Sequence, residues 1–462
     1  MSDLNGILSS AGQALLTQQQ AINVTSHNIA NVNTPGYSRQ RLQISTNTPL
    51  DTSVGLMGNG VSADSIERIY DRFLSAQITD ENQGLGRWDA QKSAVEMVEM
   101  IFNESDGYGL SQAMSKFWDA WQSLTNNPAG AAERQVLLSA SQVLAKTFNQ
   151  LDADLRQSQA DLDIAVQGTV AEINRLVEKL ADLNQKIISV EAGSSSANDY
   201  RDQREQTIKE LSELIDINTF EDASGSVHVL VANGRPLVGS GQYWQLSTQI
   251  NPTGLHDVVW ADSSGSTFDI TDDINGGKLK GYLEVRDVII SDDLNRLDTL
   301  SQTLTTDINT LHQSGFALDG SAGEVFFNGL GAGNMELNTN IAGNPDLIAA
   351  AADALTVPGD NRQAIEIAML QYQLTMNGNT TTYNDYFGAL IRDAGNEVLK
   401  SEAYYHHQSD MLAQLENRRE SISGVSLDEE MINLIKYQNA YTAAAKMISA
   451  ADEMMQTVLQ ML

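Results

Sequence analysis

The chain has 462 residues, no cysteine, and 28 Lys and Arg residues against 60 Asp and Glu residues, which gives a formal net charge of −32. This length provides room for several domains and a substantial core. The acidic balance argues against a nucleic-acid partner, because negative surfaces repel phosphate backbones, and the lack of cysteine excludes disulfides and zinc–thiolate sites.

No apolar run approaches the roughly 18 residues that a transmembrane helix needs, so we expect no membrane insertion. The opening residues, MSDLNGILSS, lack the positively charged region and the apolar stretch of a secretory signal peptide. If the protein is secreted, we therefore expect an export route without a cleaved signal.

The beginning of the chain has the heptad pattern of a coiled coil. Mostly apolar side chains recur in alternating steps of four and three, at Leu4, Leu8, Ala11, Leu15, Gln18, Ile22, Thr25 and Ile29. The helix should be about 40 Å long. It is expected to end near Asn31 to Asn33, since Pro35 disfavours helical geometry at the residue before it. Pro35 and Gly36 suit the two central positions of a type II turn.

Residues 37 to 66 alternate loosely among Gly, Thr and Ser, which predicts extended chain or a short hairpin. Helical periodicity returns with Ile66 and Ile69 and continues through Phe102. The segments NESDGYG at 103 and NNPAG at 126 should break it into antiparallel pieces. A very long helical pattern then runs from Ala131 to the Gly- and Ser-rich segment at 192. One face of this helix carries Leu162, Val166, Val170, Ile173, Val177, Leu180 and Ile187. These helices predict a bundle.

The period changes from helix to strand in the middle of the chain. Val227, Val229 and Val231 alternate with other residues, and Asn233-Gly234 is a hairpin turn signal. The segments DVVW, STFDI and YLEV are further strand candidates. Together they predict a small β domain.

Helix resumes across Val288 to Leu311, is interrupted by the Gly-rich segment GLGAGN, and returns from Asn361 and again from Tyr383. The end of the chain has a second heptad pattern, which predicts a rod of about 50 Å. Its positions are Leu427, Met431, Leu434, Gln438, Tyr441, Ala445, Ile448, Asp452, Met455, Leu459 and Leu462.

These patterns predict a mainly α protein with a nested β domain. Residues 1–36 and 425–462 should form a terminal coiled-coil assembly domain, and 37–216 and 286–424 a bundle of long helices with extended segments. Residues 217–285 should form a small outer antiparallel β domain. This nesting places both termini at one end of an elongated molecule.

Motifs that carry catalysis are absent, including G-x-x-x-x-G-K, G-x-S-x-G and H-E-x-x-H. Gly329, Gly331 and Gly333 resemble part of a dinucleotide loop, but no clear parallel strand precedes them, which favours a flexible connection. His406 and His407 are neighbours in a helix and point about 100° apart, so they cannot easily share a metal ion. We expect no enzyme activity, no cofactor and no metal.

Acidic residues begin the last helix. Glu429 and Glu430 are expected to interact with the positive end of the helix dipole, and Ser426 with Glu429 has the spacing of a capping box.

The segment SHNIANVNTPGYSRQ at 26–40 closely resembles the N-terminal signature of bacterial flagellar rod, hook and hook-associated proteins. The segments SGVSLDEEM at 423–431 and LIKYQNAY at 434–441 look like the C-terminal helix of the same superfamily. YSRQ at 37–40, DYRDQR at 199–204 and the long helices after Ile66 resemble the family of the first hook-filament junction protein. The motif residues are Asn28, Asn31, Asn33, Thr34, Pro35, Gly36, Tyr37, Ser38 and Arg39.

The resemblance implies a structural adaptor between hook and filament, whose terminal helices pack against neighbouring subunits. It implies self-assembly into a ring or helical layer, with hook protein below and the second junction protein above. It also implies export through the flagellar type III channel, an export chaperone at the C-terminal helix, and an extracellular position. The expected assembly interface comprises Leu4, Leu8, Leu15, Ile22, Ile29, Leu427, Met431, Leu434, Tyr441, Ile448, Met455 and Leu459.

Several alternatives remain open at this point. The heptad residues fit a monomer's own helical hairpin as well as an assembly surface. Another axial component, hook or distal rod, is an alternative that the long helices argue against, and a secreted glycan-binding adhesin or enzyme is a third. Asn28, Asn31 and Asn33 fit turn and helix-end roles better than intersubunit hydrogen bonds. Tyr37 and Arg39 fit packing and surface roles, or a contact with the next subunit.

Overall fold

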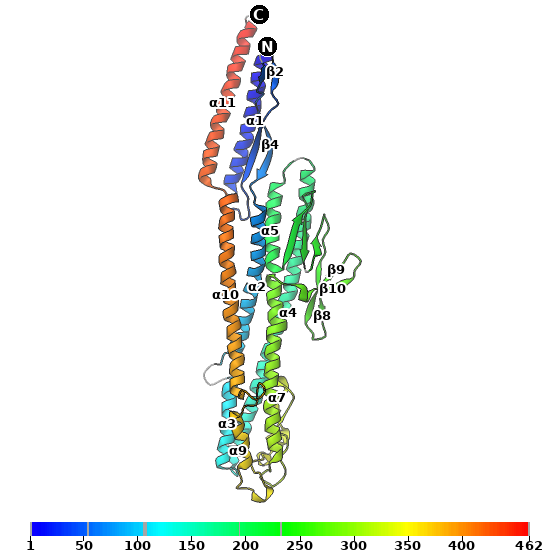
Figure 1. The fold of residues 1–462 in the computed structure, drawn as a ribbon, viewed down its shortest axis with the longest axis vertical. Helices are drawn as coiled ribbons and strands as arrows, with labels where there is room; N and C mark the ends of the chain where they lie inside the picture. Colours follow the sequence, from blue (N-terminus) through cyan, green and yellow to red (C-terminus); the bar gives the residue numbers. More distant parts are fainter. Residues whose placement is uncertain (1, 53–54, 105–108, 194, 232, 461–462) are drawn as a thin grey trace.

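The computed structural model describes residues 2–52, 55–104, 109–193, 195–231 and 233–460. The molecule is elongated, and both ends of the chain lie at one end of it, as predicted (Figure 1). Paired terminal helices occupy that end, long helices form the body, and small antiparallel sheets pack on the side of the body. The mainly α fold with a nested β domain is confirmed.

The terminal part contains two helices and four strands. These are α1 (Ser2–Ala30), β1 (Gln40–Thr46), β2 (Leu50–Thr52), β3 (Gly55–Met57), β4 (Val61–Arg68) and α11 (Leu427–Gln460). The body is built from α2 (Arg72–Phe102), α3 (Leu110–Asn126), α4 (Ala131–Glu191), α5 (Asn198–Leu214), α6 (Gly277–Leu283), α7 (Ile290–Ser314), α8 (Thr339–Gly343), α9 (Arg362–Met369) and α10 (Tyr383–Ser423). Two short strands, β11 (Phe327–Asn328) and β12 (Glu336–Leu337), pair near α7.

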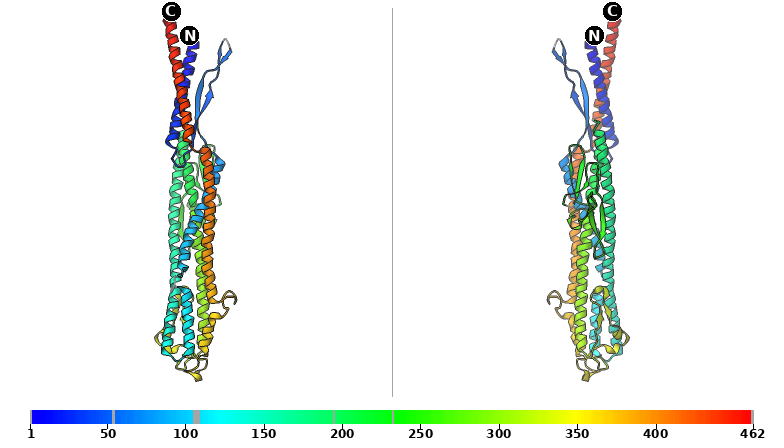
Figure 2. Two further views of the ribbon diagram at one scale, coloured as in Figure 1. Left: turned by 90° about the vertical axis from the view of Figure 1, so that its left-hand side faces the viewer. Right: turned by 90° about the vertical axis from the view of Figure 1, so that its right-hand side faces the viewer.

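The chain leaves α1 through the predicted turn. Tyr37 N donates to Thr34 O over 3.2 Å, and Gly36 has a φ of 78°, the left-handed value that a type II turn requires at its third position. The extended segment that follows is an antiparallel hairpin in which β1 pairs with β4 and β2 with β3. α1 lies against α11 and also contacts β1 and β4 (Figures 1 and 2).

The predicted start of the second helix was wrong. Ile66 pairs with Leu42 inside β4, and α2 begins only at Arg72. The carboxylate of Asp71 accepts the N–H groups of Phe73 and Leu74 and so caps the helix. The spacing of Ile66 and Ile69 fits a helix, but pairing with a strand more than twenty residues earlier determines the structure here.

The helix α4 spans two cores. Its first part packs with α3, α7 and an aromatic cluster at the far end of the body, which comprises Phe117, Trp118, Trp121, Phe326 and Phe327. Its second part packs against the strands through Val166, Val170, Ile173, Val177 and Leu180. The predicted apolar face is buried throughout.

The β domain consists of two three-stranded antiparallel sheets with the orders β5-β6-β7 and β10-β9-β8. Its strands are β5 (Ile217–Glu221), β6 (Val227–Val231), β7 (Arg235–Val238), β8 (Leu246–Ile250), β9 (His256–Ala261) and β10 (Thr267–Asp269). Asn233 and Gly234 form the predicted turn, with φ values of 57° and 88°.

The segment YLEV, predicted as a strand, is helical. Its first two residues end α6, and the next two begin a π-helical turn, Glu284–Ile289. Leu279 and Leu283 are buried one turn apart, and an added Cβ at Gly281 would lie 2.4 Å from Arg87 O. Close packing of this helix on α2 therefore prevails over the local β-propensity.

A pair of helical glycines allows a test of the packing. A Cβ at Gly86, in α2, would lie 2.0 Å from Glu213 O at the end of α5, whereas a Cβ at Gly168, in α4, would meet nothing within 4 Å. We expect Gly86→Ala to lower the free energy of unfolding by about 1–3 kcal/mol, and Gly168→Ala to raise it by about 0.5–1 kcal/mol. Denaturant unfolding measures both. Equal effects of the two substitutions would contradict the close approach of α2 and α5.

Candidate assembly joint at the base of the terminal coiled coil

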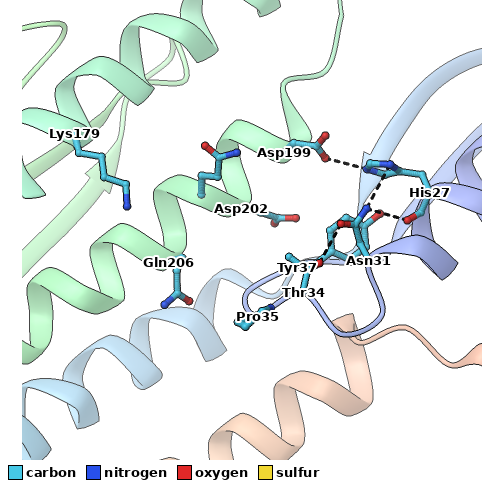
Figure 3. A pocket seen from close by; sticks show the side chains of 10 residues that line it. His27, Asn31, Thr34, Pro35, Tyr37, Lys179, Asp199, Asp202 and Gln206 are labelled. Atoms are coloured by element: carbon cyan, nitrogen blue, oxygen red, sulfur yellow. Dashed lines mark hydrogen bonds and ion pairs between the residues drawn. The ribbon is translucent and has the colours of Figure 1, made fainter.

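The motif residues lie where four elements meet. The segment after α1 passes beside the first turns of α5 and α11 before it enters β1, and Figure 3 shows its turn beside α5. We call this region, residues 27–40 with the starts of α5 and α11, the joint.

Asn28 is the buried centre of the joint. Its Nδ2 donates to Gln40 O over 2.9 Å and to Glu430 Oε2 over 3.1 Å. Its Oδ1 accepts from Gln40 N over 3.0 Å and from the Tyr37 hydroxyl over 2.8 Å. An amide side chain can donate and accept twice each, so this one is fully satisfied. Asn28 is therefore more than a helix-end residue: it connects α1, β1 and α11 within one chain.

Arg39 connects the motif to the start of α11. Its Nε donates to Glu430 Oε1 over 2.8 Å and its Nη1 to Glu429 Oε2 over 2.7 Å. The side chain of Glu430 is 3% exposed and that of Glu429 is 61% exposed, so the pair with Glu430 is the buried one. The carboxylate of Glu429, which was expected to close a capping box with Ser426, pairs with Arg39. Charge-assisted pairs of this kind orient both partners.

The motif also binds α5 through the segment DYRDQR. Asp202 accepts from Ser38 N and from Arg68 Nη1, each over 2.9 Å. Asp199 accepts from Gln40 Nε2 over 2.8 Å, and His27 Nε2 lies 3.3 Å from the same carboxylate. The motif, the end of β4 and the start of α5, which are distant in sequence, thus form one polar network.

Tyr37 contributes its hydroxyl as a donor. Burial raises the pKa of Tyr37, and the nearby charges of Asp199, Asp202 and Glu430 raise it further. The hydroxyl therefore keeps its proton and can donate to Asn28 at any physiological pH.

The other motif residues shape the turn. Asn31 Nδ2 donates to His27 O over 3.0 Å, and Thr34 Oγ1 donates to Asn31 Oδ1 over 3.1 Å, which are the helix-end and turn roles expected of such residues. Asn33, Thr34 and Pro35 are exposed. A pocket of about 400 Å³ lies between the turn and α5, where Gln206 of α5 and Lys179 of α4 line it (Figure 3).

The C-terminal heptad positions fall on two different surfaces. Leu434, Tyr441, Ile448 and Met455 are half-buried, whereas Leu427, Met431 and Leu459 are exposed. The half-buried residues form one column along α11, as predicted. A second column against α1 consists of Tyr437, Ala444 and Ala451, each one residue before the predicted Gln438, Ala445 and Asp452. Alanine permits a close approach of two helices, while the polar residues face solvent. The predicted register was therefore half correct.

The N-terminal heptad positions are partly covered. Leu8, Leu15, Ile22 and Ile29 are half-buried, and Ala11 and Thr25 are fully buried. The side chain of Leu4 lies outside the described part. The two heptad patterns thus form a helical hairpin within one chain, and they leave apolar side chains of α11 exposed.

Groups that could support catalysis are poorly arranged. In the β domain His228 Nε2 lies 2.9 Å from Asp222 Oδ2 and 3.4 Å from Ser240 Oγ. A catalytic triad needs one imidazole nitrogen for the acid and the other for the nucleophile. Here one nitrogen faces both. Within the described ranges, no three His, Asp or Glu side chains are placed to hold a metal ion, and no helix is long and apolar enough to cross a membrane.

Comparisons with known families identify the class of protein. Residues 8–37 match the family model of the flagella basal body rod protein, and residues 418–461 match that of the flagellar basal body rod FlgEFG protein C-terminal region. The matched segments contain most of α1 and all of α11. The protein is therefore a flagellar axial protein.

The particular family follows from the middle of the chain and from whole-length relatives. Residues 95–327 match the helical domain of the flagellar hook-associated protein FlgK. Flagellar hook-associated protein 1 of Bacillus subtilis (strain 168) is 31% identical over 98% of this chain and 97% of its own length. The same-named protein of Escherichia coli (strain K12) is 25% identical over 97% and 98%. The chain belongs to the flagellar hook-associated protein 1 family, as the motifs predicted.

A solved structure confirms the fold. The flagellar hook junction protein FlgK from Burkholderia pseudomallei superposes with a TM-score of 0.69 at 16% identity, and the match covers 75% of this chain and 100% of that chain.

Proposed function

We propose that this protein is a structural adaptor that assembles at the hook-filament junction through its terminal helices. The observation that carries the proposal is a strip of exposed apolar side chains on α11, next to the joint. It comprises Leu427, Met431, Ile432 and Ile435. Contiguous exposed apolar surface of this kind marks an interaction site, and family membership supports the junction as its location.

The joint gives this surface a fixed direction. Arg39 and Asn28 hold the start of α11 against β1, so the apolar strip stands at a defined position relative to the bundle. An assembly surface that is oriented before binding loses less entropy on association. The hydrogen bonds of the motif thus act within the chain, and the side chains of α11 act between chains.

The proposal includes the partners that the family resemblance implies. Copies of this chain would form a ring or helical layer, with hook protein on one side and the second junction protein on the other. An export chaperone would bind the C-terminal helix before export through the flagellar channel, which places the working protein outside the cell. Residues 1–36 and 425–462 would be the assembly domain, 37–216 and 286–424 the supporting bundle, and 217–285 the outer domain.

A charge on the apolar strip tests the proposal. Met431 is 55% exposed, so Met431→Lys should leave the melting temperature of the monomer nearly unchanged. In the assembly the lysine would lose water without gaining a partner, so we expect attachment to hooks to fall at least tenfold. Binding of the purified chain to isolated hooks measures this.

A matched control is Ile164→Lys, on the surface of α4, where the parent residue is 66% exposed. This variant should bind hooks normally. Normal binding by Met431→Lys, or equal losses in both variants, would contradict a role of the strip in assembly.

A further inference from the structure

The β1–β4 hairpin extends beyond the part of it that packs on α1. Near its middle, Thr17 Oγ1 in α1 donates to Val61 O over 3.5 Å, and Asn47 hydrogen-bonds to Gln13. Beyond these contacts the hairpin continues as the two-stranded sheet of β2 and β3, which diverges from α1 (Figure 2). A two-stranded ribbon is at best marginally stable in water. We therefore expect this end of the hairpin to be stabilised by packing against another surface.

The side chains near the end of the hairpin are apolar. Leu56 is 76% exposed and Met57 is 50% exposed. Successive residues of a strand point to opposite faces, so each face of the ribbon presents one of them. The end of the projecting ribbon therefore carries an exposed apolar side chain on each face, and we call this end the hairpin tip.

A second apolar surface lies on α11, at the same distance from the joint as the hairpin tip. Asn28 binds both Gln40 in β1 and Glu430 in α11, so the hairpin and the helix start from one level. Leu56 pairs with Asp51, eleven residues beyond Gln40, which is roughly 36 Å at about 3.3 Å per residue. Met454 is twenty-four residues beyond Glu430, also roughly 36 Å at about 1.5 Å per residue.

Met454 has a companion on the same side of α11. Met447 precedes it by seven residues, or two helical turns, and both side chains are about half exposed. Methionine side chains adapt to partners of varied shape. The pair therefore forms an apolar surface on α11 that α1 of the same chain leaves uncovered.

We propose that the hairpin tip of one copy docks on Met447 and Met454 of a second copy beside it. This inference rests on the proposed function and names the two surfaces that would join neighbours. Because the tip and the methionine pair are different surfaces of one chain, the contact is heterologous. Such contacts propagate into rings or helices instead of closing a two-fold dimer.

Two observations favour a second copy of this chain as the partner of the hairpin tip: the tip and the methionine pair lie at the same distance from the joint, and the hairpin already packs on a terminal helix. Copies standing side by side at one level bring the tip of one chain to the methionine pair of the next. The part of the hairpin nearest the joint already packs on α1 of its own chain. Its tip would likewise pack on a terminal helix, but on α11 of the neighbouring copy.

The absence of native cysteine makes a cross-linking test direct. Cells would express two single-cysteine forms of the full chain together, Leu56→Cys and Met454→Cys, and their flagella would be isolated and treated with a bismaleimide. We expect a cross-linked dimer of about twice 50.2 kDa that requires both forms. The matched control pairs Leu56→Cys with Leu355→Cys, an exposed apolar position in the short turn Ala354–Thr356. The segment around residue 350 lies at the end of the bundle opposite the termini (Figure 1).

Each outcome decides the matter. A dimer with Met454→Cys, and at most one tenth as much with Leu355→Cys, supports the docking. No dimer, or equal yields from both pairs, in flagella that contain the variants in normal amounts would overturn the docking alone. Absence of the parent chain and of both variants from flagella would contradict the proposed function, and the docking with it.

Discussion

Replacing Glu430 with alanine is expected to separate the terminal helices from the joint. Glu430 accepts from both Arg39 and Asn28 in a setting where its own side chain is 3% exposed. Removing one partner of a buried ion pair leaves the other without compensation, which costs about 3–5 kcal/mol. Arg39 retains Glu429, so we expect a loss of about 3 kcal/mol in the stability of the α1–α11 pair.

The neighbouring carboxylate provides the control. Glu429→Ala removes the same charge from the same partner, but its side chain is mostly exposed, so the loss should stay below about 1 kcal/mol. Amide hydrogen exchange resolves the two helices from the bundle, since it reports local opening. Faster exchange in α1 and α11 with Glu430→Ala, and little change in the bundle, is the expected pattern. Equal effects of the two substitutions would show that burial of Glu430 does not matter.

Local patterns predicted the elements whose structure depends on neighbours in sequence. The apolar face of α4, the end of α1 before Pro35, and the Asn233-Gly234 turn follow from residues only a few positions apart. Such signals can be read from one chain because helix periodicity and turn geometry are local properties.

The errors arose where distant parts of the chain meet. Ile66 is a strand residue because Leu42 pairs with it, and the YLEV segment is helical because α6, which contains its first two residues, packs on α2. One of the two buried columns of α11 lies one residue earlier than predicted, because Ala451 is small and apolar enough to be buried against α1 and the predicted Asp452 is not.

The joint could be predicted only in part. The motif residues were identified from family resemblance, but no signal within the motif indicated that Asn28 would bind Glu430, 402 residues later. A cue did exist in charge: the motif contains Arg39, the segment DYRDQR contains Asp199 and Asp202, and the segment SGVSLDEEM contains Glu429 and Glu430. Pairing opposite charges between recognised motifs would have proposed the contacts of Arg39 with Glu429 and Glu430. It would not have proposed the hydrogen bonds of Asn28 or of Ser38.

Asp293→Asn is expected to stabilise the bundle at neutral and alkaline pH. Asp293 in α7 is 5% exposed, and its Oδ2 has no hydrogen-bond partner among the described residues. Burial raises its pKa to about 7, the charges of Asp292, Asp393 and Glu397 act in the same direction, and Arg296 opposes them. An aspartate in an unfolded chain titrates near 3.9. The folded state therefore binds this proton more tightly than the unfolded state.

The sign of the pH dependence follows from this difference. The contribution of protonated Asp293 is fully present below about pH 4 and is lost as the pH rises to about 7, a change of about 4 kcal/mol. Asparagine has the same shape and no charge, so Asp293→Asn should be up to about 4 kcal/mol more stable than the parent at pH 8 and should lose this part of the slope. Urea unfolding at pH 5 and pH 8 measures this difference in stability.

The control is Asp292→Asn. The parent side chain is 66% exposed, so this substitution should change the free energy of unfolding by less than about 1 kcal/mol. The free energy of unfolding changes between pH 5 and pH 8, and this change should be smaller in Asp293→Asn than in the parent. An equal change in both would mean that Asp293 is ionised in the folded bundle across this range.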